Sequence, residues 1–180
     1  MKMKHKVIVT VVLLAVLGLY LVASPQNLKE GDIVFQMSKS KQSPLVQYAT
    51  LSPWSHCGIV IEKGDKLYVL EASNVVKLTP LDEWKKKGRL GIIKSKRVCN
   101  EPVKIRYKKY LGIPYDLQFK FNNGKYYCSE LVYEIYRDQL GIELCKPKEI
   151  KRYNTLGIKK KMNQRGISSK QLAVAPCDLI

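Results

Sequence analysis

Histidine is scarce in this chain, which has only His5 and His56 among its 180 residues. His5 lies in a short basic segment at the N-terminus, so imidazole chemistry in a folded domain must use His56. His56 is followed by Cys57, Gly58 and the apolar run Ile59-Val60-Ile61, a pattern typical of a buried strand. An imidazole at the start of such a strand costs free energy unless it is hydrogen-bonded. The scarcity of histidine therefore makes His56 a candidate functional residue.

Paired cysteines of the CxxC type are absent. The five cysteines are widely spaced: Cys57, Cys99, Cys128, Cys145 and Cys177. This spacing does not favour a zinc site, and we expect neither a metal nor another cofactor. An exported protein can pair two or four of the five and leave one free, which suits a catalytic thiol. The sequence leaves the pairing open.

Acidic residues are few, since 15 Asp and Glu stand against 32 Lys and Arg and give a net charge of +17. Lys2, Lys4 and Lys6 contribute three of these positive charges, so the rest of the chain carries +14 of the +17. Residues 146–170 hold nine Lys or Arg against the single acid Glu149. Such a field favours anionic surfaces. Two interpretations stay open: an anionic membrane surface as partner, or a solvated lysine-rich face without one.

The N-terminus lacks charge from Val7 to Val22, directly after the basic residues 1–6. This pattern predicts that residues 1–24 are a signal peptide, or an N-terminal membrane anchor through residues 7–23. We therefore expect an exported protein, periplasmic or otherwise extracytoplasmic, for which nucleic acid is not a partner. Residues 25–180 have the length of one catalytic domain, and its oligomeric state is left open.

The sequence also lacks repeats and low-complexity tracts. Apolar patterns and turn residues predict strands over 31–36, 56–62, 67–72, 92–98 and 171–174. They predict helices over 44–50, with Ser43 as N-cap, from Pro80 to before Gly88, over 101–111 and over 128–140. Strands and helices segregate along the chain. This order favours an α+β domain with an antiparallel sheet.

The two strands around Lys63-Gly64-Asp65-Lys66 predict a hairpin that relates His56 to Glu71. A Lys63-Gly64 loop places His56 directly opposite Glu71. A Gly64-Asp65 loop pairs His56 with Ser73 and makes Glu71 its diagonal neighbour. Both registers put His56 and Glu71 on one face of the sheet.

A carboxylate next to an imidazole fixes its tautomer and stabilises the imidazolium. Glu71 lies in the otherwise apolar strand Tyr68-Val69-Leu70-Glu71-Ala72, where burial without a partner is costly. We therefore expect His56 as its partner. The alternative is that Glu71 ends the strand and faces water.

Cys128 stands at the start of the predicted helix 128–140, on one stripe with Leu131, Val132 and Ile135. A thiol in the first turn lies at the positive end of the helix dipole, which lowers its pKa. Neighbouring backbone N–H groups, such as that of Ser129, lack helical partners and can bind an oxyanion. The alternative is a small buried core residue.

Several motifs together resemble one family. The sequence resembles the YiiX/YebB group of circularly permuted papain-fold hydrolases, relatives of NlpC-type enzymes and of lecithin:retinol acyltransferase. The resemblance covers most of residues 30–140 and rests on Gly31-Asp32-Ile33-Val34-Phe35-Gln36, Ser55-His56-Cys57-Gly58, Tyr68-Val69-Leu70-Glu71-Ala72, Gly112-Ile113-Pro114-Tyr115-Asp116 and Tyr127-Cys128-Ser129-Glu130-Leu131-Val132, with a weaker echo at 174–179.

The resemblance implies a permuted papain-like antiparallel sheet packed against helices. It implies Cys128 as nucleophile, His56 as general base and Glu71 as the orienting residue. Tyr115 resembles the family tyrosine near the thiol and is expected either to donate to the oxyanion or to be a core tyrosine. Residues 142–171 do not match the family, so the substrate stays open.

The expected function is that of an exported cysteine-dependent amide hydrolase, an amidase or peptidase acting through an acyl-enzyme at Cys128. The expected substrate is a lipid N-acyl amide or a cell-wall (peptidoglycan) peptide. Aromatic residues near Cys128 in sequence predict an aromatic-lined groove: Tyr115, Phe119, Phe121, Tyr126 and Tyr127. Two alternatives remain, a cysteine acyltransferase acting on lipids and a noncatalytic envelope-binding module.

Overall fold

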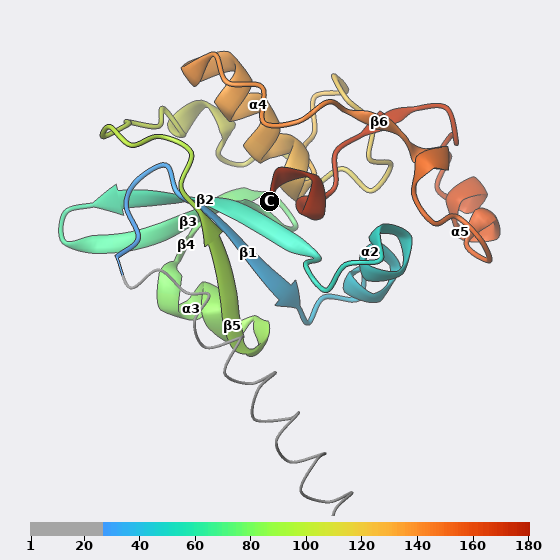
Figure 1. The fold of residues 1–180 in the computed structure, drawn as a ribbon, viewed down its shortest axis with the longest axis horizontal. Helices are drawn as coiled ribbons and strands as arrows, with labels where there is room; N and C mark the ends of the chain where they lie inside the picture. Colours follow the sequence, from blue (N-terminus) through green and yellow to red (C-terminus); the bar gives the residue numbers. More distant parts are fainter. Residues whose placement is uncertain (1–26) are drawn as a thin grey trace, which may run out of the picture.

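The computed structural model describes residues 27–180 and shows a five-stranded antiparallel sheet with helices on both faces (Figure 1). The strand order is β4-β3-β2-β1-β5. The strands are β1 (Ile33–Ser38), β2 (His56–Lys63), β3 (Lys66–Ala72), β4 (Val76–Pro80) and β5 (Gly88–Lys96). The predicted α+β class with an antiparallel sheet is therefore confirmed.

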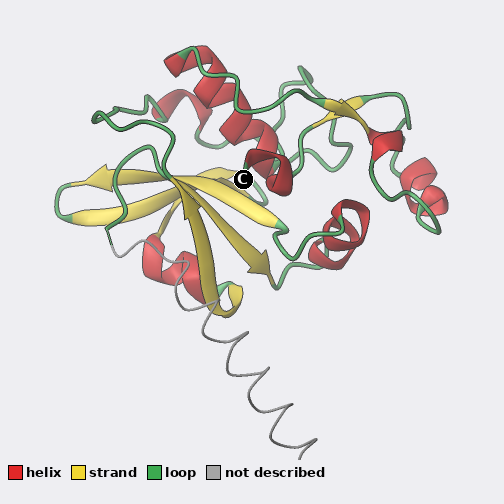
Figure 2. Cartoon of the chain, viewed as in Figure 1, coloured by secondary structure: helices red, strands yellow, loops and turns green. Residues whose placement is uncertain are grey.

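Two helices cover opposite faces of this sheet (Figure 2). Helix α4 (Cys128–Leu140) packs against β2 over the larger core cluster, while α3 (Leu81–Lys86) covers a smaller cluster around Trp84. The remaining elements are α2 (Ser43–Thr50), α5 (Lys159–Gln164), the two-stranded pair β6 (Lys148–Glu149) and β7 (Leu172–Ala173), and the 3-10 turns η1 (Lys108–Tyr110), η2 (Ile150–Arg152) and η3 (Pro176–Leu179).

The hairpin of β2 and β3 has the second of the two predicted registers. Lys63 pairs with Lys66 and Ile59 with Leu70, so Gly64 and Asp65 form the two-residue turn. Gly64 has φ +58°, a left-handed conformation that glycine adopts without a steric cost. An even loop length keeps His56 and Glu71 on one face of the sheet.

Helix α4 begins and ends where the sequence predicts. Its apolar stripe, Cys128, Leu131, Val132 and Ile135, is buried against the sheet. Gly141 follows with φ +67° and its backbone N–H bonds the carbonyl oxygens of the last turn, which ends the helix. The first residue of α4 is thereby held at the edge of the core.

The predicted helix over 101–111 is wrong. Only the 3-10 turn η1 forms, and the preceding residues 102–107 have no regular secondary structure. The carboxylate of Glu30 accepts hydrogen bonds from the backbone N–H of Ile105 and from Lys104 Nζ, at 2.9 and 2.8 Å. The buried Ile105 side chain anchors this segment to the core. A distant carboxylate thus replaces the local helical hydrogen bond that the prediction assumed.

Three smaller differences concern neighbouring elements. Strand β4 was not predicted, and β5 begins at Gly88 rather than at residue 92. Ser43 is the first residue of α2 rather than its N-cap, because its hydroxyl is hydrogen-bonded to Ser55 Oγ.

The predicted leader, residues 1–24, lies outside the described residues. Within residues 27–180, no helix has the length and apolar character needed to cross a bilayer.

Candidate active site

His56 and Glu71 form a hydrogen-bonded pair where β2 begins and β3 ends. His56 Nε2 lies 2.6 Å from Glu71 Oε2, and the side chains are 12% and 1% exposed. The expectation that Glu71 faces His56 is therefore confirmed, and the water-facing alternative is wrong. With Nε2 engaged by Glu71, Nδ1 is the ring nitrogen left for another partner.

The Glu71 carboxylate has three further partners that the sequence analysis did not identify. Thr79 Oγ1 donates to Oε1 at 2.6 Å, Trp84 Nε1 donates to Oε2 at 3.1 Å, and Lys87 Nζ donates to Oε1 at 3.3 Å. Burial raises the pKa of Glu71, but the bonds to His56 and Thr79 and the charge of Lys87 outweigh it and lower the pKa to about 2. Glu71 is therefore ionised throughout the neutral range.

Cys128, the first residue of α4, is the third residue of this site. Its sulfur is hydrogen-bonded to His56, so the structure brings together all three residues that the sequence singled out. Burial lowers the pKa of His56, yet the bonds to Cys128 and Glu71 outweigh this effect and raise the pKa to about 10. The pKa of Cys128 lies well below its ordinary value. A thiolate facing an imidazolium is the stable form of this pair.

Cys57 is a second thiol at the same place, and sequence analysis did not assign it a role. It is fully buried on β2, in the core cluster that also contains Cys128. Its hydrogen bond to Cys128 is the largest cause that lowers the Cys128 pKa, ahead of the bond to His56. Burial and the charge on Cys128 raise the pKa of Cys57 itself, so Cys57 stays a thiol and donates. All five cysteines are free.

The residues on either side of Cys128 are tied to one segment near the C-terminus. Ser129 Oγ donates to the carbonyl oxygen of Val174 at 2.7 Å, and the Val174 N–H donates to Tyr127 Oη at 3.1 Å. The Ser129 hydroxyl is therefore engaged, and only its backbone N–H is left to serve an oxyanion. The predicted contribution of Ser129 is thus confined to the main chain.

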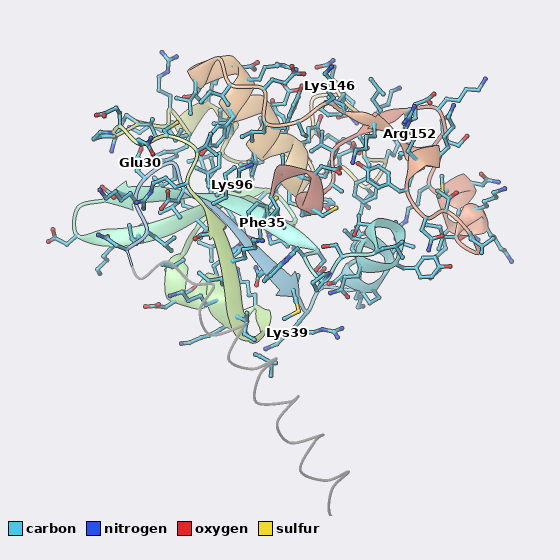
Figure 3. All side chains as sticks on the ribbon, in the orientation of Figure 1. Glu30, Phe35, Lys39, Lys96, Lys146 and Arg152 are labelled. Atoms are coloured by element: carbon cyan, nitrogen blue, oxygen red, sulfur yellow. The ribbon has the colours of Figure 1, made fainter. Side chains whose placement is uncertain are left out.

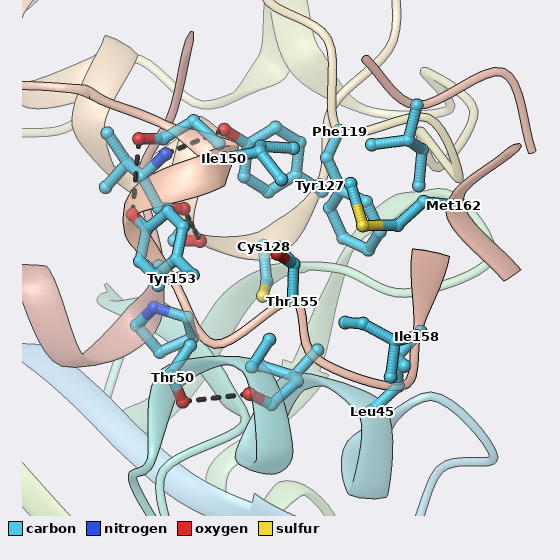
Figure 4. Close-up of a pocket in the computed structure, with 18 of the residues that line it drawn as sticks. Leu45, Thr50, Phe119, Tyr127, Cys128, Ile150, Tyr153, Thr155, Ile158 and Met162 are labelled. Carbon is cyan, nitrogen blue, oxygen red and sulfur yellow. Dashed lines mark hydrogen bonds between the residues drawn. The ribbon is translucent and has the colours of Figure 1, made fainter. Parts of the chain in front are cut away.

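A small apolar cavity of about 100 Å³ lies against Cys128 (Figure 4). The Cys128 side chain stands between Leu45 and Thr50 of α2 on one side and Phe119, Tyr127 and Met162 on the other. The wall of the cavity comes from α2, α5 and the segments before and after α4, so regions distant in sequence build it.

The predicted aromatic groove is present in part. Tyr115, Phe119 and Tyr127 line the apolar cavity. Phe121 and Tyr126 do not line it. Phe121 makes edge contacts with Tyr127 and Tyr133, and Tyr126 makes one with Tyr110.

A larger cavity of about 780 Å³ opens on the other side of the site, where His56 and Glu71 line it. Most of the residues that line it are polar or charged, and it is called the polar cavity below. Tyr115 and Val46 line both cavities and so form the wall between them. Tyr115 is half-buried, and burial and the charge on Cys128 raise its pKa well above the ordinary value. Tyr115 therefore lines the cavity that contains Cys128 and also packs against the core cluster.

Taken together, these groups can perform nucleophilic acyl transfer. Such chemistry needs three parts: a thiolate at a helix start, an imidazolium to protonate a leaving group, and a buried carboxylate to hold the imidazole. The hydrogen bond from the Leu131 N–H to the Tyr127 carbonyl oxygen is the first within α4, so the N–H groups of Cys128 and Ser129 have no intrahelical acceptor.

Comparisons with known proteins agree with this chemistry. Residues 27–177 match the family model described as permuted papain-like amidase enzyme, YaeF/YiiX, C92 family. The match includes residues 142–171, so the expectation that this segment departs from the family is wrong. YiiX of Escherichia coli (strain K12) is 37% identical over 131 residues, which cover 69% of this chain and 65% of that protein's length.

A solved structure extends the comparison to three dimensions. The crystal structure described as metalloprotein yiiX from Escherichia coli O157:H7 has a TM-score of 0.76 and 32% identity, and the match covers 84% of this chain and 91% of that one. Within residues 27–180, no group of three or more His, Cys, Asp or Glu side chains is placed to hold a metal ion, so the described donor set does not fit one. The matches in sequence and fold agree, and the chain belongs to the permuted papain-like amidase family YaeF/YiiX.

Proposed function

We propose that the protein is an exported amidase that cleaves a lipid N-acyl amide through an acyl-enzyme at Cys128. The observation that carries this proposal is the apolar cavity in contact with the thiol of Cys128. A cell-wall peptide is the competing amide. Its peptide groups need hydrogen-bonding partners, which an apolar wall does not offer, whereas an acyl chain is stabilised there by burial.

In the first half of the proposed reaction, the Cys128 thiolate attacks the amide carbon and the carbonyl oxygen becomes an oxyanion. The imidazolium of His56 then gives its proton to the leaving nitrogen, and the C–N bond breaks to release an amine and leave a thioester on Cys128. Glu71 remains ionised and holds the His56 ring toward the sulfur.

In the second half, His56 acts as base and takes a proton from water, which attacks the thioester carbon. Collapse of this intermediate releases a carboxylic acid and restores the thiolate. Backbone N–H groups at the start of α4, including that of Ser129, are the proposed oxyanion donors, with the Tyr115 hydroxyl as a further one. An amine or alcohol in place of water would make the same site an acyltransferase.

Two features of the sequence support an extracytoplasmic, membrane-associated location. The basic residues 1–6 and the uncharged residues 7–22 have the pattern of an export signal or anchor. In the folded domain, exposed lysines on α5 lie next to Met162, whose side chain lines the apolar cavity. An anionic lipid surface attracted by these lysines would therefore lie on the side of the acyl site that α5 forms.

Chromogenic amides with acyl chains of increasing length test the proposal directly. Each methylene buried in the cavity contributes about 0.8 kcal/mol, so kcat/KM is expected to rise about fourfold per methylene until the cavity is filled. Mass spectrometry of the protein caught during turnover should find the acyl group on Cys128. Cys128→Ala should abolish both signals, and Cys145→Ala, away from both cavities, should preserve them.

Other outcomes select the alternatives. Activity confined to peptides with D,L bonds would assign the protein to wall hydrolysis. Transfer of the acyl group to an added amine or alcohol, in preference to water, would make it an acyltransferase. Absence of any Cys128-dependent turnover would contradict the amidase and favour an envelope-binding module.

A further inference from the structure

The polar cavity lies where the amine half of the substrate must leave. The apolar cavity contacts Cys128, whereas the polar cavity contacts His56, and Tyr115 and Val46 separate the two. The group that protonates a leaving nitrogen faces that nitrogen during bond cleavage. If the acyl chain fills the apolar cavity, the amine is directed into the polar one.

Positive charge predominates around this second cavity. Lys39, Lys41 and Lys87 line it, and Glu71 is the one acidic residue among its lining residues. The Glu71 carboxylate is already bound by His56 and Lys87. The excess of cations over available carboxylates therefore favours an anionic ligand.

Two of these lysines have no carboxylate partner among residues 27–180. Lys39 Nζ donates to the carbonyl oxygen of Lys86 at 3.0 Å, which leaves its charge uncompensated. Lys41 is exposed and makes no ion pair with a described residue. Both belong to the loop between β1 and α2, and Lys39 lies directly beyond the end of β1 (Figure 3). They form the cationic rim of the polar cavity.

Two residues that line the cavity also carry unpaired polar atoms. Gln36 Oε1 and Ser73 Oγ are buried and lack hydrogen-bond partners within the described chain, and both residues line the cavity. Gln36 is only 1% exposed and pairs with His56 across β1 and β2, which places the two side chains on one face. Buried polar atoms are rarely left unpaired, so these positions point to a polar ligand next to His56.

We propose that the polar cavity is a subsite for a leaving amine that carries an anionic group, a carboxylate or a phosphate. This inference rests on the proposed amidase function and names the second half of its substrate. The Lys39 and Lys41 ammonium groups bind the anion, while Gln36 and Ser73 satisfy polar groups closer to the scissile bond. The substrate is thus an acyl chain joined through an amide to a small anionic amine.

Four amides that share one acyl chain provide the test. Their amine halves are glycine, phosphoethanolamine, neutral glycinamide and cationic ethylenediamine. We expect kcat/KM to be higher for the two anionic amides than for the neutral one, and lowest for the cationic one. The glycine and phosphoethanolamine arms distinguish a carboxylate from a phosphate. Equal rates on all four would overturn the subsite.

A paired set of variants assigns the effect to the rim. The double variant Lys39→Gln/Lys41→Gln should lower kcat/KM for the anionic amides about two- to fivefold per lysine, as for partly exposed ion pairs, and leave the neutral amide unchanged. The control Lys63→Gln/Lys66→Gln removes the same charge at the far end of the β2–β3 hairpin and should change neither. A uniform loss on all amides in the rim variant would contradict the proposal.

Binding to Cys128→Ala separates this inference from the amidase function. Calorimetric titration with the glycine and glycinamide amides should show tighter binding of the anionic one, with an affinity that falls as salt rises. If no amide is cleaved by the wild type but this preference is found and lost in the rim variant, the subsite holds and the amidase does not. Equal, salt-insensitive binding would reject the subsite whether or not amides are cleaved.

Discussion

The imidazole of His56 reaches Glu71 along a diagonal of the β2–β3 hairpin, with 2.6 Å between Nε2 and Oε2. Continuation of the register from Ile59 and Leu70 places His56 opposite Ser73, two residues beyond Glu71. The diagonal contact is fixed from the Glu71 side, because Thr79, Trp84 and Lys87 hold the carboxylate. Orientation of the imidazole therefore depends on a network across β3, β4 and α3.

Loss of the Glu71 charge should have a smaller effect on turnover than loss of the imidazole. His56→Ala should lower kcat by about 10²- to 10⁴-fold, the usual contribution of a general base. Glu71→Gln should lower kcat less, since the proton transfer itself remains. Steady-state kinetics with a chromogenic amide measure both effects.

The pH profile gives the same pair of residues an independent readout. Activity should fall above about pH 10, where His56 loses its proton and can no longer protonate the leaving nitrogen. Glu71 stabilises the imidazolium, so Glu71→Gln should lower the His56 pKa and move this alkaline limb to lower pH. An unmoved limb would show that Glu71 does not act through His56.

Cys128 should be the thiol most readily alkylated in the native protein. Its lowered pKa keeps it a thiolate at pH values where Cys57, Cys145 and Cys177, whose pKa values are raised, are protonated. Limited treatment with iodoacetamide near neutral pH, followed by peptide mass spectrometry, should find the label at Cys128. His56→Ala should slow this labelling, and preferential labelling of Cys57 or Cys145 would contradict the nucleophile assignment.

Cys57 is expected to support the Cys128 thiolate by donating a hydrogen bond. Cys57→Ala removes the donor and should raise the Cys128 pKa, whereas Cys57→Ser retains a donor and should keep it low. The pH dependence of thiolate absorbance and of alkylation rate measures the difference. Equal pKa values in the two variants would show that the contact between the sulfurs is packing alone.

The lysines of α5 should attract the domain to anionic membranes. Each contributes about 1 kcal/mol near such a surface, so Lys160→Gln/Lys161→Gln should weaken binding to anionic vesicles by about tenfold or more. Salt should release the wild type. The control Lys63→Gln/Lys66→Gln makes the same charge change elsewhere and should bind as the wild type does. Equal sedimentation with neutral and anionic vesicles would contradict this role.

Local patterns were sufficient to predict much of the fold. The apolar stripe and Gly141 define α4, and either even-length turn keeps His56 and Glu71 on one face. The choice between the two registers was not predictable, because Lys63-Gly64 and Gly64-Asp65 are both acceptable turns. The site residues found from sequence are those that stand at the ends of these strongly patterned elements.

The parts that sequence did not predict depend on contacts between distant segments. Thr79, Trp84 and Lys87 reach Glu71 only because β4 pairs with β3 and α3 packs against both strands. The segment 101–111 has a helical pattern, but the distant carboxylate of Glu30 binds the Ile105 N–H and only a 3-10 turn forms. Such long-range hydrogen bonds override local propensity and leave no periodic signal in the sequence.

A last prediction concerns Glu130, the third residue of α4, which is 1% exposed. Burial raises its pKa from the ordinary 4.5 to about 8, although the Tyr127 N–H donates to it and partly opposes the shift. Between pH 4.5 and 8 the folded protein then binds more protons at this site than the unfolded chain does. The contribution of Glu130 to stability is therefore complete below pH 4.5 and is lost as the pH rises through 8.

Glu130→Gln should remove this loss while keeping an oxygen that accepts the Tyr127 N–H. Urea unfolding of the wild type should show a free energy of unfolding that declines between pH 5 and pH 8 relative to the variant, which cannot ionise there. Glu83→Gln, at an exposed position on α3, should run parallel to the wild type. The wild type and Glu83→Gln both keep the Glu130 carboxyl group, which Glu130→Gln lacks. The difference between their curves and that of Glu130→Gln therefore reports the ionisation of this one group. Parallel curves for all three proteins would mean that Glu130 is charged in the folded state, and the start of α4 would then carry a negative charge beside the thiolate.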